Sequence, residues 1–336
     1  MSIVADLAAI PKSWRNAVVA IGNFDGVHCG HQAVLAAARA QAAHIGAPLI
    51  MLTFEPHPRT YFRPQEPVFR LTPAAIKAAA AGAFGVDGVL VMSFDAELSA
   101  MSAEDFVRDI LVDRLAIRHA VTGYDFHFGH RRQGTPEFLK SSGVLHQFGV
   151  TIVSEHGDEE GAVSSSRIRE TLAEGAIAET NQLLGWTWSV SGTIHHGEKR
   201  GRELGYPTAN MAPDPACRLR HGIYAVRFTR SDGTVHDGVA SFGRRPTFDN
   251  GHPLLETYLF DFSGDLYGQA VLISLVAWIR PELKFDTVED LISRMNDDSA
   301  RTRSFLNEIQ PTPIDSEIRD VWRQLMSDRS GHVEHI

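Results

Sequence analysis

The first half of the chain alternates short apolar runs with amphipathic stretches of helical period. Five apolar runs predict buried strands, at 17–21, 48–54, 88–94, 119–126 and 150–154. The stretches between them predict helices, most clearly at 31–45, 73–84 and 103–116. Strands that alternate with helices pair in parallel, so this half predicts a doubly wound, Rossmann-like α/β sheet. In such sheets ligands bind at the carboxyl ends of the strands.

The pattern changes after about residue 184, where strands follow one another without long helices between them. The expected strands are 189–196, 222–229, 235–242, 254–262 and 270–280, with a helix after them at 288–306. Turn signals separate the strands, which predicts an antiparallel barrel or sandwich. We therefore expect one domain over 1–184, a second over 185–310 and a partly helical tail over 311–336.

Composition narrows the classes of protein that fit. With 336 residues, 43% of them hydrophobic, the chain can build two cores. The net charge of −9 disfavours a broad nucleic-acid surface, which relies on many Lys and Arg side chains. The two cysteines, Cys29 and Cys217, form no spacing motif, and no secretory pattern or membrane-length apolar run is present. We expect a cytoplasmic protein without nucleic-acid or membrane partners; these features do not predict its oligomeric state.

The first chemical motif is G-N-F-D-G-V-H-C-G-H, over 22–31. It follows a predicted strand and opens a predicted helix, so free backbone N–H groups and the positive helix end favour an anion there. His28 and His31 stand three residues apart, which directs both imidazoles to one side of the first turn. We expect both histidines to act in catalysis by stabilising charge on a phosphate. The residues predicted to bind ATP in this motif are Gly22, Phe24, Asp25, His28, Gly30 and His31.

A run of three hydroxyls and two arginines, V-S-S-S-R-I-R over 163–169, precedes another helical stretch. Ser164 or Ser165 can cap that helix, and Arg169 offers a bidentate fork to phosphate. Together with the histidine motif, the run predicts a triphosphate clamp formed by Ser164, Ser165, Ser166 and Arg169. The alternative is an ordinary helix cap followed by a solvated basic turn.

These motifs resemble the FAD synthetase module of bacterial bifunctional riboflavin kinase/FAD synthetases. The resemblance extends to T-F-E-P-H-P over 53–58 and G-Y-D-F-H-F-G over 123–129. The chain has Ser166 where the family pattern has Thr, which keeps the hydroxyl, and Asp125 where some members have Asn. The resemblance implies attack by the phosphate of FMN on the α-phosphorus of ATP, with Asp125 as a flavin contact.

The second chemical motif is G-R-E-L-G-Y-P-T-A-N, over 201–210. Thr208 and Asn210 stand two apart in an extended segment, so they share a face and offer two oxygen ligands to Mg²⁺. Gly201 and Gly205 allow a close approach of the backbone to phosphate. The residues predicted to bind ATP in this motif are Gly201, Gly205, Pro207, Thr208 and Asn210.

Glu256 is the candidate base for this second site. On its predicted strand it shares a face with Leu254, Tyr258 and Phe260, where a carboxylate is costly unless it is partnered or functional. The alternative is a strand-edge glutamate near the rim of the barrel.

The second half resembles riboflavin kinase, a small closed β-barrel. The resemblance includes G-I-Y-A over 222–225, D-L-Y-G over 265–268 and I-R-P-E over 279–282. It implies that Thr208 and Asn210 hold Mg²⁺–ATP and that Glu256 is the base. Arg280 and Phe285 are candidate flavin contacts, with barrel packing as the alternative. Many members have Asn at the position of Ser241 and His at that of Tyr258, so contacts to the flavin there are expected to differ.

Both resemblances together imply a bifunctional enzyme. Riboflavin and ATP would give FMN in the second half, and FMN and ATP would give FAD and pyrophosphate in the first, with Mg²⁺ in both steps. Two alternatives stay open: the first half adenylylates another phosphate ester, or the chain binds flavin without catalysis. The presence of both chemical motifs favours the bifunctional enzyme.

Overall fold

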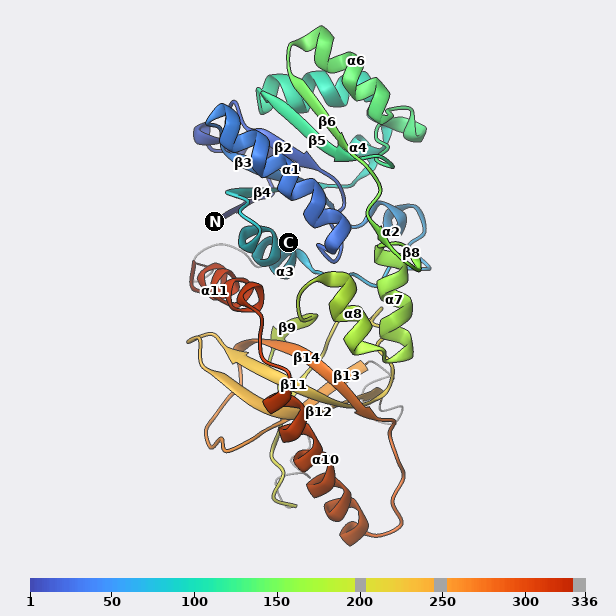
Figure 1. The fold of residues 1–336 in the computed structure, drawn as a ribbon, viewed down its shortest axis with the longest axis vertical. Coiled ribbons are helices and arrows are strands. Elements are labelled where there is room, and N and C mark those ends of the chain that lie inside the picture. The colour runs from blue at the N-terminus through green and yellow to red at the C-terminus, as the bar shows by residue number, and fades with distance from the viewer. Residues whose placement is uncertain (197–203, 245–252, 329–336) are drawn as a thin grey trace. The chain divides into compact units, whose positions relative to one another are not determined.

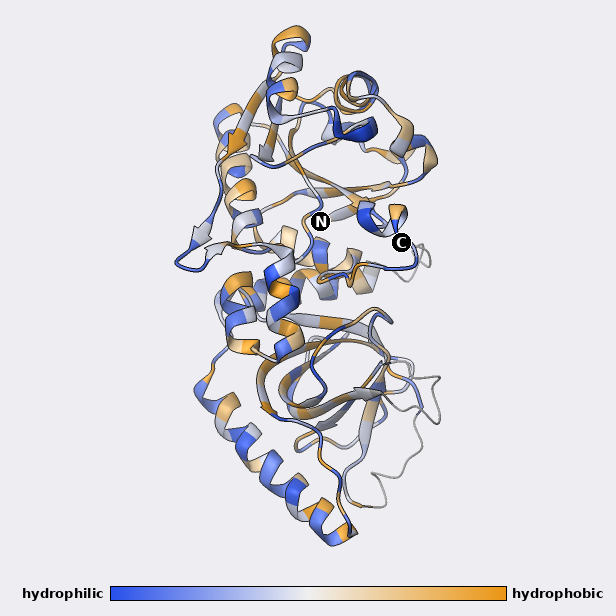
Figure 2. Cartoon of the chain, turned by 90° about the vertical axis from the view of Figure 1, so that its right-hand side faces the viewer, coloured by the Kyte–Doolittle hydropathy of each residue, from blue (hydrophilic) through white to orange (hydrophobic). Residues whose placement is uncertain are grey.

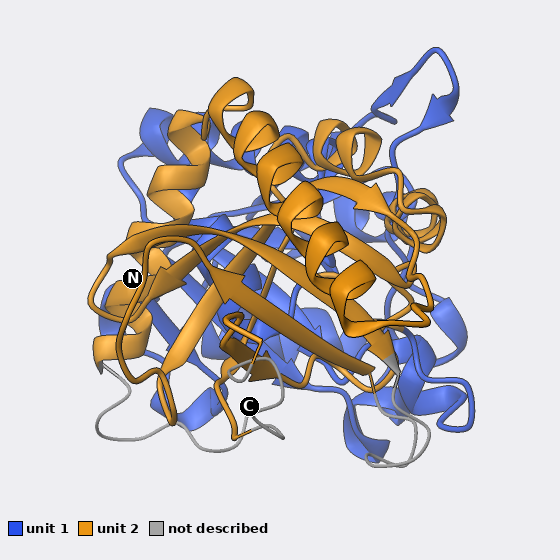
Figure 3. Ribbon diagram, turned by 90° about the horizontal axis from the view of Figure 1, so that it is seen from below, with its two compact units in different colours: residues 1–68, 72–164, 331–336 blue, residues 69–71, 165–330 orange. Residues whose placement is uncertain are grey.

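The computed structural model describes residues 1–196, 204–244 and 253–328, traced in Figure 1. The chain divides into two compact units, coloured separately in Figure 3. Among the described residues, unit 1 holds 1–68 and 72–164, and unit 2 holds 69–71 and 165–328. The domain border expected at residue 184 stays a prediction.

Unit 1 is built on a sheet of six parallel strands in the order β1-β4-β3-β2-β5-β6. Its strands are β1 (Ser2–Val4), β2 (Val18–Ile21), β3 (Leu49–Glu55), β4 (Gly88–Ser93), β5 (His119–Gly123) and β6 (Gly149–Val153). The prediction of a parallel α/β sheet is confirmed. The edge strand β1 was not predicted, because three residues are too short to show a strand pattern.

Helices connect these strands, and α1 packs against β2 and β5 in the middle of the sheet. The α-helices of unit 1 are α1 (Cys29–Ile45), α2 (Pro58–Phe62), α3 (Ala74–Ala83), α4 (Ala96–Ala100), α5 (Ala103–Asp105) and α6 (Pro136–His146). A π-helical segment, Phe106–Arg114, continues α5. Helix α1 ends at Gly46, whose φ of +65° is a left-handed conformation that glycine adopts readily. The central strand β2 is wholly buried, so the loop that follows it has a rigid base.

Unit 2 is built on an antiparallel sheet of six strands in the order β10-β13-β12-β11-β14-β9. Its strands are β9 (Ser189–Thr193), β10 (Thr208–Met211), β11 (Gly222–Arg230), β12 (Val235–Arg244), β13 (Pro253–Leu259) and β14 (Ala270–Arg280). An isolated bridge joins β10 to the segment that follows β9, where His195 N–H donates to the Asn210 carbonyl at 2.9 Å. The prediction of an antiparallel β-unit is therefore confirmed.

The described residues of unit 2 form the helices α7 (Ser165–Glu174), α8 (Ile177–Leu184), α10 (Val288–Glu308) and α11 (Pro313–Asp328). Leu306 and Phe305 of α10 pack on Ala225, Phe260 and Ile279 of the β-unit. Most of the remaining surface of α10, the long helix at the bottom of Figure 2, is hydrophilic. Among the described residues, no helix is both long enough and apolar enough to span a membrane.

Candidate active sites

The loop after β2 has an unusual backbone. Phe24, Gly26 and Val27 all have positive φ, at +48°, +94° and +42°. Side-chain anchors hold this conformation, because Asp25 Oδ1 accepts a hydrogen bond from the Thr72 N–H at 3.0 Å and Gly26 N–H donates to Thr72 Oγ1 at 2.8 Å. The loop thereby turns the chain from the carboxyl end of β2 into the first turn of α1.

The two predicted catalytic histidines lie together at this turn. His28 is the N-cap of α1 and its Nδ1 accepts a hydrogen bond from the His31 N–H at 3.4 Å. The two rings stack with centroids 3.7 Å apart. Because Nδ1 of His28 accepts this hydrogen bond, any ring proton of His28 lies on Nε2.

The electrostatics of His31 favour its neutral form. Burial lowers the pKa of this imidazole well below its usual value, and repulsion from His28 and Lys77 lowers the pKa further. Its buried Nδ1 has no hydrogen-bond partner within the described part of the chain. A neutral imidazole with an unpartnered nitrogen beside a helix N-terminus is a ready hydrogen-bonding group for a phosphate ligand.

Gly30 packs closely against His28. A Cβ at this position would lie 3.1 Å from Cε1 of His28 and 3.4 Å from the Val163 carbonyl oxygen. A larger residue would press on the His28 ring, so the glycine keeps the ring in its place. Gly22 is at the start of the loop, where its N–H donates to the Leu52 carbonyl at 3.1 Å.

Sequence reasoning missed a buried lysine next to this loop. Lys77 on α3 is 3% exposed, and its Nζ lies 2.9 Å from Glu55 Oε1 and 3.3 Å from Thr53 Oγ1. A lone cation in the alanine-rich helix Ala74–Ala83 was the available signal. Thr53 and Glu55 belong to the T-F-E-P-H-P motif, which was noted without a role for either side chain.

The other predicted residues of the first site fall into two groups. Asp125 is exposed on the loop after β5, and β5 neighbours β2, so this loop leaves the same edge of the sheet as the histidine loop. Ser164 is the last residue of that stretch of unit 1, whereas Ser165, Ser166 and Arg169 belong to α7 of unit 2. Nε of Arg169 donates to the Phe69 carbonyl at 2.7 Å, within unit 2. The shared triphosphate clamp stays a prediction.

In unit 2 the strand register brings the second set of predicted residues together. Asn210 on β10 pairs directly with Glu256 on β13, and Thr208 pairs with Tyr258. Glu256 also pairs with Ser241 on β12. Directly paired residues of antiparallel strands lie on the same face of the sheet. Thr208, Asn210 and Glu256 therefore share one face, with the amide and the carboxylate on adjacent strands.

The Asn210 side chain offers an oxygen of the kind that Mg²⁺ binds. Asn210 is 6% exposed, and its Oδ1 has no hydrogen-bond partner among the residues that the structure describes. A buried carbonyl oxygen of this kind is costly unless a ligand satisfies it, and Mg²⁺ prefers oxygen ligands. Nearby, Pro207 is exposed and Gly205 has a φ of +82°. Gly201 lies outside the described residues.

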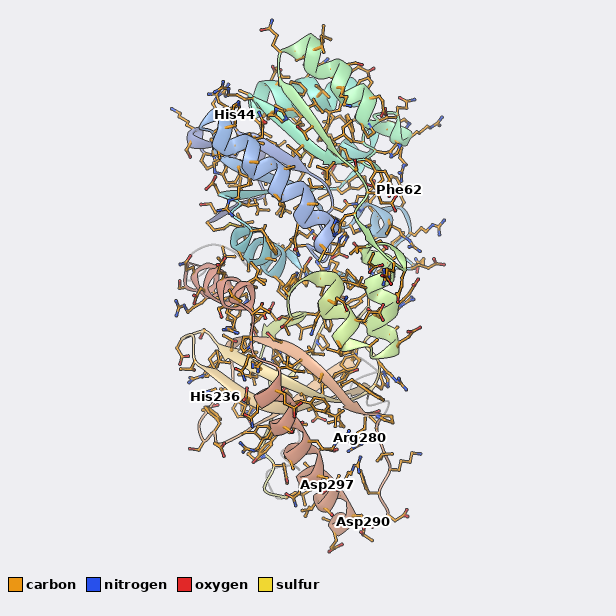
Figure 4. The ribbon with its side chains drawn as sticks, in the orientation of Figure 1. His44, Phe62, His236, Arg280, Asp290 and Asp297 are labelled. Carbon is orange, nitrogen blue, oxygen red and sulfur yellow. The ribbon has the colours of Figure 1, made fainter. Side chains whose placement is uncertain are left out.

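The two candidate flavin contacts lie at the end of β14. Arg280 is 7% exposed, and its Nε and Nη2 donate to Asp298 of α10, with the shortest contact at 2.6 Å (Figure 4 labels Arg280). Its guanidinium carbon lies 6.0 Å from the centre of the Phe285 ring. Arg280 thus fastens α10 to the β-unit, and the role of both residues toward flavin stays a prediction.

These two units define a class of protein. A parallel α/β sheet with paired histidines at a helix N-terminus is suited to nucleotidyl transfer. An antiparallel unit that sets oxygen ligands beside a carboxylate is suited to phosphoryl transfer to an alcohol. The class is that of a two-unit transferase that acts on ATP.

Comparison with known proteins gives the family. Residues 10–167 match the family model described as FAD synthetase, and residues 184–306 match the one described as riboflavin kinase. The chain belongs to the bifunctional riboflavin kinase/FMN adenylyltransferases. A relative of that name from Pseudomonas fluorescens is 39% identical over 305 residues, covering 90% of this chain and 97% of the relative. One from Listeria monocytogenes is 38% identical over 298 residues, covering 88% and 94%.

A solved structure shares the fold. A crystal structure described as a macrolide-efflux protein from Streptococcus pneumoniae matches with a TM-score of 0.79 and 29% identity. The match covers 90% of this chain and 98% of that one. The efflux description belongs to the pneumococcal protein, and what the two chains share is the fold.

Proposed function

We propose that this chain makes FMN and FAD in two consecutive reactions at two separate sites. Unit 2 transfers the terminal phosphoryl group of ATP to riboflavin, which gives FMN and ADP. Unit 1 transfers the adenylyl group of a second ATP to FMN, which gives FAD and pyrophosphate. One observation carries the proposal: the paired histidines belong to unit 1, whereas Thr208, Asn210 and Glu256 belong to unit 2.

In the kinase reaction the nucleophile is a neutral alcohol, so a base has to take its proton. Glu256 is the proposed base, and its neighbour Asn210 with Thr208 is proposed to hold Mg²⁺ on the ATP phosphates. The bound ion would neutralise charge on the transferring phosphoryl group. We also propose that the sheet closes into a barrel through the bridge between His195 and Asn210, which would stiffen the strand that carries both magnesium ligands.

In the adenylyl transfer the nucleophile is the phosphate of FMN, which is already ionised near neutral pH. A phosphate oxygen attacks the α-phosphorus of ATP, and pyrophosphate leaves. The reaction needs position and charge stabilisation more than it needs a base. Nε2–H of His28, the neutral His31 ring and the N-terminus of α1 are proposed to bind the developing charge. Ser164, Ser165, Ser166 and Arg169 are the proposed phosphate clamp.

The direct test is to incubate the purified chain with riboflavin and ATP, with and without Mg²⁺, and to separate the flavins by chromatography. With Mg²⁺ we expect FMN to appear first and FAD afterwards, together with ADP and pyrophosphate. Excess EDTA should stop both steps. Riboflavin that is left unchanged by the complete mixture would rule the proposal out.

A further inference from the structure

The buried lysine of unit 1 is placed where it can act on the histidine loop. Only 4% of the Lys77 side chain is exposed, and 13% of the Glu55 side chain. A buried ammonium is costly unless it is paired, and Glu55 supplies the opposite charge at 2.9 Å. An ion pair alone would satisfy the charge, yet Lys77 also contacts a hydroxyl.

That hydroxyl connects the lysine to the loop. Nζ of Lys77 lies 3.3 Å from Oγ1 of Thr53, and the same Oγ1 donates to the Asn23 carbonyl at 2.9 Å. Thr53 is fully buried, at 0% exposure. Because a hydroxyl has one proton, its donation to Asn23 leaves a lone pair for the lysine N–H. The three groups therefore form a directed chain that ends on the loop backbone.

The helix that carries Lys77 holds the loop at a second point. Thr72, just before α3, is hydrogen-bonded to Asp25 and Gly26. Asn23 is held by Thr53 of β3, which Lys77 of α3 contacts in turn. Between these anchors lies Phe24, with a φ of +48°. A non-glycine residue with positive φ persists only where its surroundings enforce that conformation. The anchors supply this enforcement next to the N-cap of α1.

We propose that Lys77 is a positioning residue for the adenylyl transfer, acting through Thr53 and the Asn23 carbonyl on the loop that presents His28 and His31. The proposal rests on the adenylyl-transfer function proposed for unit 1. It assigns to α3 the task of holding the loop in its strained form while ATP reacts. The positive charge of Lys77 also helps to keep the pKa of His31 low, which is consistent with a neutral ring in the site.

The test compares two substitutions at Thr53 in the full chain. Thr53→Val keeps the volume and removes the hydroxyl, whereas Thr53→Ser keeps the hydroxyl. We expect Thr53→Val to lower kcat for FMN to FAD by about 10- to 100-fold, because small misplacements of reacting groups have effects of that size. KM for ATP should change little, since the loss concerns the transition state. Thr53→Ser should retain most of the activity, and riboflavin kinase activity is the internal control in both variants.

A double-mutant cycle tests whether the residues act in series. Lys77→Met should reduce kcat to a similar extent, and adding Thr53→Val should cause no further loss, because either change breaks the same chain. If Lys77→Met does not fold, by circular dichroism, the comparison of Thr53→Val with Thr53→Ser decides alone. Wild-type kcat in Thr53→Val, or losses that multiply in the double variant, would overturn the proposal.

His28→Ala in parallel separates this inference from the function beneath it. An inactive His28→Ala with a fully active Thr53→Val would reject only the role of Lys77. A His28→Ala variant that converts FMN to FAD at the wild-type rate would reject the proposed histidine site itself.

Discussion

At the residue scale, His28 and His31 act as a unit because each fixes a property of the other. The ring of His28 caps the helix through the backbone of His31, and the two rings stack. Repulsion from His28 contributes to the low pKa of His31, after the larger effect of burial. The result is that the neutral form of His31 is favoured at the helix N-terminus, next to the capping ring of His28.

This electrostatic arrangement predicts a pH-dependent stability. Below about pH 6.5 an unfolded His31 binds a proton that the folded protein does not, so the free energy of unfolding falls as the pH falls. His31→Gln lacks this group. Between pH 7.5 and pH 5.5 we expect the wild type to lose more stability than His31→Gln, by up to about 1.4 kcal/mol. The free energy of unfolding at each pH is measured by urea titration, with hydrogen exchange of β2 and β5 as the probe. An identical pH dependence in both proteins would contradict the expectation.

The histidine pair was predictable from sequence because its geometry is local, as two residues three apart at a helix start always face one side. The contact of Lys77 with Thr53 was not, since it joins side chains 24 positions apart on a helix and a strand. Arg280 was named from the sequence as a candidate flavin contact, but its carboxylate partner Asp298 could not be predicted. Whether such an arginine meets a carboxylate or a ligand depends on where α10 lies.

At the scale of elements, α10 is held on the β-unit by a small apolar contact and by charge. Leu306 and Phe305 supply the apolar part, and the buried pair of Arg280 and Asp298 supplies the charged part. Tyr206, which directly precedes the exposed Pro207, donates a hydrogen bond to Asn296 of the same helix. The helix is thereby linked to the segment that leads into the magnesium ligands.

Removing one charge from the buried pair should destabilise unit 2. Asp298→Asn leaves the Arg280 guanidinium buried without a counter-charge, which we expect to lower the free energy of unfolding by about 3 kcal/mol. Asp261→Asn is the matched control, because Asp261 pairs with Arg303 of the same helix at the surface. That change should have no measurable effect, since exposed pairs contribute little. Equal losses in the two variants would show that burial of the pair is irrelevant.

Strand β10 shows the limit of pattern reading at this scale. No strand was predicted here; Thr208 and Asn210 were expected in an extended segment, and their shared face follows from that alone. Their pairing with Glu256, 46 positions further on, depends on the register between β10 and β13. No periodicity in the sequence specifies a register between strands so far apart, so only the structure sets the proposed base beside the proposed metal ligands.

At the scale of the whole molecule, the two units each contain a complete local motif, and this is why the bifunctional family could be predicted from the sequence. The sequence did not predict which unit α7 and α8 pack on. Asn181 of α8 bonds to the Leu275 carbonyl and to the Trp188 N–H, and Thr180 bonds to Thr171 of α7. These contacts make both helices part of unit 2, although an amphipathic pattern does not tell which sheet a helix packs on.

The central claim is that ATP reacts at two separate sites, and three single variants test it most directly. Riboflavin or FMN is supplied with ATP and Mg²⁺, and the flavin products are separated by chromatography. Asn210→Ala and Glu256→Gln should lose FMN formation by at least about 100-fold and still convert supplied FMN to FAD at the wild-type rate. His28→Ala should accumulate FMN and form no FAD. A properly folded Asn210→Ala protein that has lost both activities would contradict the account.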